Sequence, residues 1–73
     1  MTTEKRELAI EVIKEAYEFG GDRDKVYTSI NNLIDEITEP DSVDRAELKM
    51  VNSTYKLKRL LDENDKILKA LKN

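Results

Sequence analysis

Residues 43–73 read VDRAELKMVNSTYKLKRLLDENDKILKALKN, and this stretch contains neither Gly nor Pro. Its apolar residues recur at helical spacing from Val43 to Leu71. Ser42 or Asp41, just before the stretch, is a suitable N-cap. The stretch therefore predicts one continuous helix over about residues 43–72, roughly 45 Å long at about 1.5 Å per residue.

A heptad pattern can be placed along this helix with Val43 at position a. Seven of its nine a and d positions are then apolar, which is typical of a coiled-coil surface. A separate apolar patch, Leu48, Val51 and Tyr55, lies on the other side of the first half. We expect the N-terminal half of the heptad seam to join the intramolecular core and the C-terminal half to bind a partner. The seam consists of Val43, Ala46, Met50, Ser53, Leu57, Leu60, Asn64, Ile67 and Leu71, and Thr54, Leu61 and Leu68 widen it.

The polar run Asp62-Glu63-Asn64-Asp65 interrupts the apolar pattern, and two interpretations of it are open. In one, Asn64 or Asp62 caps a short fourth helix that begins near residues 62–65. However, neither residue starts a capping box, and no Gly or Pro supports a turn there. In the other, the helix is continuous and Asn64 occupies an a position, where a lone Asn can specify the register of a two-stranded pairing. The pattern favours the second interpretation.

Two further helices are predicted on either side of the only glycines, Gly20 and Gly21, with Pro40 ending the second. The first covers about residues 3–19, and its apolar arc of roughly 200° is wide enough to need two neighbouring helices. The second covers about residues 23–38 and has a narrower apolar stripe of roughly 120°. Asp22 is its expected N-cap, and Gly20 is expected to end the first helix in a left-handed conformation. The aromatic residues Tyr17, Phe19, Tyr27 and Tyr55 are expected to pack in the core.

These elements predict an all-α fold formed by a single domain over residues 1–73. The predicted architecture is an up-down-up bundle of three helices, in which the long third helix has a coiled-coil-like C-terminal half. The alternative is a four-helix arrangement with a break near residues 62–65. A chain of 73 residues buries a small core, and oligomerisation is a common way to enlarge it.

The composition argues against most catalytic and metal chemistry. The chain has no Cys and no His, and Gly20-Gly21 does not belong to a phosphate-binding loop. We therefore predict no catalytic residue, no metal site, no cofactor and no enzymatic activity. No apolar run is long enough to cross a bilayer, and the N-terminal residues do not resemble a signal peptide, so a cytoplasmic location is the expectation.

Charged side chains form two helical faces, although the net charge is only −3. A basic stripe on the third helix suggests nucleic-acid binding as one alternative function, and an acidic ridge on the first suggests mimicry of a nucleic acid as another. The simpler interpretation is that these charges pair with each other or face solvent. The basic stripe is Arg45, Lys49, Lys56, Arg59 and Lys66, and the acidic ridge is Glu7, Glu11, Glu15 and Glu18.

The favoured function is that of a non-enzymatic protein-interaction module, a small regulator or inhibitor that binds a larger protein through apolar helical seams. In size and composition the chain resembles small immunity proteins, antitoxins and phage-encoded inhibitors, although no particular residue carries this resemblance. We also expect self-association, with the third helices of two copies pairing in a homodimer. The expected interface residues are Leu57, Leu60, Leu61, Asn64, Ile67, Leu68 and Leu71.

Overall fold

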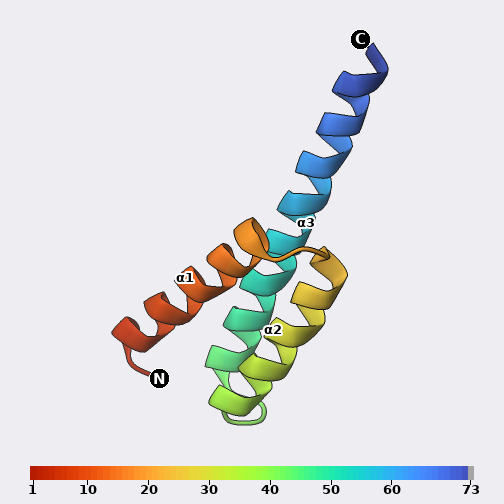
Figure 1. Cartoon of the computed structure of the whole chain (residues 1–73). Helices are drawn as coiled ribbons and strands as arrows, with labels where there is room; N and C mark the ends of the chain where they lie inside the picture. The colour runs from red at the N-terminus through yellow and green to blue at the C-terminus, as the bar shows by residue number, and fades with distance from the viewer. Residues whose placement is uncertain (73) are drawn as a thin grey trace.

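The computed structural model describes residues 1–72, which form three helices and no strand: α1 (Thr3–Phe19), α2 (Arg23–Ile37) and α3 (Val43–Lys72). The chain runs up α1, down α2 and up α3, and α3 extends far beyond the other two helices (Figure 1). This confirms the predicted three-helix bundle. Because α3 is helical through residues 62–65, the four-helix alternative is wrong. The long axis of the molecule measures 48 Å, close to the length expected for α3 alone.

Each helix begins at a side chain that accepts hydrogen bonds from the first turn. The Thr2 hydroxyl accepts from the amide of Lys5 at 3.2 Å, and the Ser42 hydroxyl accepts from the amide of Arg45 at 3.1 Å. The Asp22 carboxylate accepts from the amides of Asp24 and Lys25 at 2.8 and 3.4 Å. These backbone hydrogen bonds, that of Asp24 first, lower the pKa of Asp22. The predicted cap at Asp22 is thus confirmed, and of the two candidates before α3, Ser42 rather than Asp41 accepts the hydrogen bond.

Gly20 ends α1, but not in the expected left-handed conformation. Its φ is −73° and its ψ 146°, so the residue is extended, and its amide donates to the Ala16 carbonyl at 2.7 Å. A Cβ atom at this position would collide with the Ala16 carbonyl oxygen and with a methyl group of Val26. Gly20 is therefore required for close approach of α1 and α2 rather than for a positive φ. The positive φ, 60°, belongs to Asp41 in the turn before α3.

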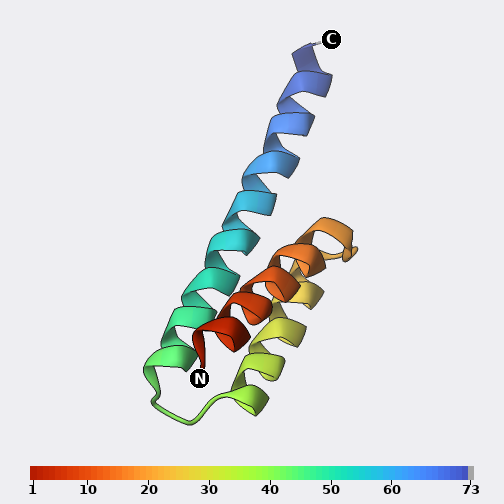
Figure 2. The same cartoon turned by 90° about the vertical axis from the view of Figure 1, so that its left-hand side faces the viewer.

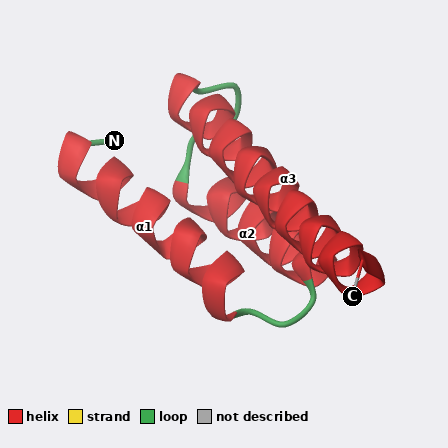
Figure 3. Ribbon diagram, turned by 90° about the horizontal axis from the view of Figure 1, so that it is seen from above, coloured by secondary structure: helices red, strands yellow, loops and turns green. Residues whose placement is uncertain are grey.

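The core lies where α1 and α2 meet the first half of α3. Both helices pack more extensively on α3 than on each other, so α3 is the central element. Figure 2 shows α3 along one side of the bundle, and Figure 3 shows α1 set to one side of α2 and α3. The buried apolar residues are Ile13, Tyr17, Ile30, Ile34 and Leu48, with Ala9, Ile10, Ala16, Val26, Val51 and Tyr55 packed around them.

The aromatic residues are not all in the core. The rings of Tyr17 and Tyr55 stack with centroids 6.4 Å apart, which joins α1 to α3. Phe19, at the end of α1, is 83% exposed, so its predicted burial is wrong. Tyr27 is half-buried, and the Lys56 ammonium lies 4.3 Å from the centroid of its ring.

Candidate protein-interaction surface

The heptad seam of α3 faces away from the bundle along its whole length. At about 100° per residue, its positions are centred roughly half a turn from Leu48, Val51 and Tyr55, the residues that contact the core. Val43, Met50 and Leu57 are 73%, 70% and 55% exposed. The prediction that the N-terminal half of the seam belongs to the core is therefore wrong, because α1 and α2 both lie on the Leu48 side of α3.

The C-terminal half of the seam is also exposed, and its last part projects beyond the other helices. Residues 64–72, called here the free end of α3, are all exposed (Figure 1). Leu60, which precedes this end, is half-buried. The other apolar residues of the predicted interface are between 55% and 78% exposed, and Asn64 lies among them in solvent: Leu57, Leu61, Ile67, Leu68 and Leu71. The seam is thus a largely apolar, exposed surface along α3, in which Ser53 and Asn64 are polar and Leu60 is half-buried.

The basic stripe is mostly occupied by contacts within the chain. Arg45 and Lys49 pair with Asp35 at 3.4 and 2.9 Å, and Lys49, followed by Arg45, lowers the pKa of that carboxyl. Lys56 pairs with Asp24 at 3.4 Å. The stripe therefore fastens α2 to α3, and a nucleic acid would have to displace these partners.

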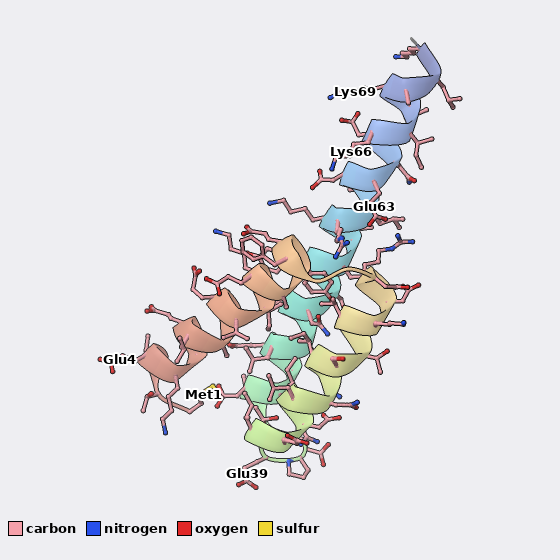
Figure 4. All side chains as sticks on the ribbon, in the orientation of Figure 1. Met1, Glu4, Glu39, Glu63, Lys66 and Lys69 are labelled. Carbon is pink, nitrogen blue, oxygen red and sulfur yellow. The ribbon has the colours of Figure 1, made fainter. Side chains whose placement is uncertain are left out.

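Arg59, also from the basic stripe, closes the end of the bundle. Its guanidinium donates to the carbonyl of Gly20 at 2.8 Å and to that of Tyr17 at 3.2 Å, and it also donates to Gly21. The Glu63 carboxylate pairs with the Arg59 guanidinium at 3.3 Å and also pairs with Arg23 of α2. Lys66 lies further along, on the free end (Figure 4). Four of the five residues of the basic stripe therefore make contacts within the chain.

The acidic ridge lies on the solvent side of α1. Glu7, Glu11, Glu15 and Glu18 are all exposed. Like charges at positions i and i+4 repel each other mildly, so this face favours solubility over stability. Residues 1–72 contain no group of three or more Asp, Glu, His or Cys side chains that could hold a metal ion.

A buried polar cluster, which the sequence interpretation missed, joins all three helices. Asn52 of α3 is fully buried, and its side-chain oxygen accepts a hydrogen bond from the Tyr17 hydroxyl of α1 at 2.5 Å. Its amide nitrogen donates to the Asn31 side chain at 3.0 Å and to the Tyr27 carbonyl at 3.2 Å. The sequence does contain a signal for this cluster, because the spacing i, i+4, i+7 and i+11 places four residues on one face of α3: Leu48, Asn52, Tyr55 and Arg59. The cluster fixes the bundle that presents the seam.

The buried Tyr17 hydroxyl should make the fold sensitive to alkaline pH. Burial, and to a lesser extent the proximity of Tyr27, raise the pKa of Tyr17 from 10.0 to about 12, although Arg59 acts in the opposite direction. The folded state therefore favours the neutral phenol, and its stabilising contribution is complete below pH 10 and lost as the pH rises toward 12. We expect urea unfolding to show a loss over this range that is absent in Tyr17→Phe, with an upper limit of about 2.8 kcal/mol for two pKa units at about 1.4 kcal/mol each. Equal alkaline slopes for both proteins would contradict this assignment.

Comparison of the chain with protein-family models, curated proteins and solved structures finds no match. Among the described residues, no helix has the length and apolar character needed to cross a membrane.

Proposed function

We propose that this chain is a non-enzymatic protein-interaction module that pairs with a second copy through the exposed seam of α3. The observation that carries the proposal is the position of the seam, which is largely apolar and faces away from the chain's own core. A contiguous apolar surface on a small protein usually marks an interaction site.

A second copy is a suitable partner because the seam is a long, straight helical surface. Two such surfaces can meet in an isologous interface, which closes and leaves no further seam exposed. The pairing would also support the free end, since a helical segment without tertiary packing is marginally stable in water. Asn64 would lie within this interface, where hydrogen bonding to its counterpart would favour one register.

The biological role that fits such a module is that of a small regulator or inhibitor, which acts by occupying a surface of a larger protein. Nucleic-acid binding through the basic stripe is less well supported, because Arg45, Lys49, Lys56 and Arg59 have partners within the chain. The acidic ridge on α1 has no feature beyond its exposure that would favour nucleic-acid mimicry.

A charge placed on the seam should separate the two copies. Leu61 is 58% exposed, so Leu61→Glu should leave the monomer folded while making the interface unfavourable. We expect sedimentation equilibrium to show a dimer for the unaltered protein at about 10–100 µM and a dissociation constant raised at least tenfold in the variant, equivalent to about 1.4 kcal/mol.

The matched control is Leu8→Glu, because Leu8 is 66% exposed on α1 and lies away from the seam. This variant should sediment like the unaltered protein. Asn64→Leu should strengthen the pairing or change its stoichiometry, since it removes the polar residue from the seam. A monomer at 100 µM in the unaltered protein would refute self-pairing.

A further inference from the structure

The face of the bundle opposite α3 carries a second apolar surface, a groove between α1 and α2. Ile13, Ile30 and Ile34 form its floor and are nearly fully buried. Leu8 and Val12 of α1 form one wall, 66% and 42% exposed, and Leu33 and Ile37 of α2 form the other, 40% and 47% exposed. The hollow between them has a volume of about 390 Å³. It is open because α1 and α2 pack on α3 and diverge from each other.

The groove continues toward the α1–α2 connection. A second hollow lies over Ala16, Phe19 and Val26, and Ile30 lines both hollows. The combined surface follows α1, whose 17 residues span roughly 25 Å. An apolar groove of this length between two helices suits one additional helix, which would complete a four-helix arrangement.

The apolar arc of α1 supports the same conclusion from the sequence. Its width requires two neighbouring helices, and α3 covers only the side that contains Ile13 and Tyr17. The remaining side, with Leu8, Val12 and Phe19, stays exposed because α2 contacts α1 less extensively than α3 does. The second neighbour of α1, α2, therefore covers its apolar arc only in part.

The charges beside the groove indicate which helix would fit. Glu4 and Glu11 lie one turn from Leu8 along α1, and Glu15 lies one turn from Val12. On α2, Glu36 follows Leu33 by one turn. Asp22, Lys5, Lys25 and the Met1 ammonium line the hollows themselves, so with the four glutamates the five acids and three positive charges leave a net charge of −2. Figure 4 shows Glu4 at the outer end of α1. A helix with basic side chains beside its apolar face would complement this rim.

We propose that the α1–α2 groove is a docking site for an amphipathic helix of another protein, with Lys or Arg flanking its apolar face. The site lies on the opposite side of the bundle from the seam and does not depend on pairing through α3. The free end of a second copy is a poorer occupant, because that contact would be head-to-tail and would leave a groove and a free end open for continued growth.

The experiment uses a displayed library of helical peptides about 18 residues long, with a fixed Leu stripe and flanking positions randomised among Lys, Glu and Gln. Selection on the full chain should enrich peptides with Lys in the flanks. Fluorescence anisotropy should show that Val12→Glu weakens the best of them at least tenfold, a change large enough to measure reliably. The matched control is Val43→Glu, which places the same charge on the seam and should change the affinity less than twofold.

The charge preference is tested separately with the double variant Glu11→Lys and Glu15→Lys. It should weaken the selected Lys-flanked peptide and strengthen the version in which Lys is replaced by Glu. Circular dichroism checks that each variant keeps its helical content.

Three results would overturn the proposal. They are the absence of selected binders, the selection of peptides without excess Lys, and binding that is insensitive to Val12→Glu in a folded protein. A peptide of residues 56–72 that binds the groove as tightly as the selected peptides would instead assign the site to a second copy. Peptide binding reports on the groove and sedimentation reports on the seam. Failure of the docking proposal can therefore be distinguished from failure of the pairing through α3.

Discussion

Replacing Asn52 by Ala is expected to lower the free energy of unfolding by about 3 kcal/mol. The substitution removes a fully buried side chain and leaves the Tyr17 hydroxyl, the Asn31 amide oxygen and the Tyr27 carbonyl without the partner that they share. A domain of this size has a total stability of only about 3–5 kcal/mol, so the variant should be partly unfolded at 25 °C. Urea denaturation followed by circular dichroism measures the change.

A double-mutant cycle distinguishes the polar contact from simple loss of packing. Tyr17→Phe removes the hydroxyl that donates to Asn52, and in the Asn52→Ala background this hydroxyl has already lost its acceptor. We therefore expect the two effects to be non-additive by about 1 kcal/mol or more. The matched control is Asn32→Ala, which alters an exposed Asn of α2 and should change stability by less than about 0.5 kcal/mol. Additive effects of Asn52→Ala and Tyr17→Phe would show that the cluster has no special role.

The helices and their order were predictable because the signals that define them are local. The bounds of α1 and α3 agree with the prediction, and α2 ends at Ile37, one residue earlier than expected. Caps at Asp22 and Ser42 depend only on side-chain oxygens beside the first turn. Continuity of α3 through Asn64 followed from the absence of a competing turn signal.

The inward face of α3 was not predictable in the same way, because the helix has two apolar faces. The heptad seam has more apolar residues than the Leu48 face, and a count of hydrophobic side chains favours it as core. The Leu48 face is completed by Asn52, which hydrogen-bonds to α1 and α2, and by Arg59, which donates to carbonyls at the end of α1 and in the connection after it. Periodicity ranks faces by hydrophobicity, so it underestimates a face whose interior contacts are hydrogen bonds.

The two faces of α3 together explain how so small a protein holds a long, exposed apolar seam in a defined position. The inner face binds both other helices through Leu48 and the Asn52 cluster, which leaves the outer face free. Because α1 and α2 need only the first half of α3, the helix can extend past them without losing its anchor. The seam is therefore held on a helix whose position is fixed by contacts on its opposite side.

Arg59 should be the most important charged residue for the position of that helix. Arg59→Met keeps most of the apolar stem but removes the donors to the carbonyls of Tyr17 and Gly20. We expect a loss of about 2 kcal/mol, since hydrogen bonds from a charged group each contribute about 1.5–3 kcal/mol and the site is partly open to solvent. Arg59→Lys should restore less than half of this loss, because an ammonium group cannot reproduce the planar set of donors that reaches several carbonyls.

The effect should be concentrated at the end of α1, where those carbonyls lie. Amide hydrogen exchange in Arg59→Met should accelerate most at the last turn of α1 and around Gly20, since the guanidinium holds this end against α3. Lys66→Met is the matched control: it removes a basic side chain two turns further along the same stripe, and it should change stability by less than about 0.5 kcal/mol. Equal effects of the two substitutions would mean that Arg59 acts only through its charge. The distinction matters because Tyr17 contributes both a carbonyl to Arg59 and a hydroxyl to Asn52, so loosening α1 at Arg59 should also weaken the buried cluster.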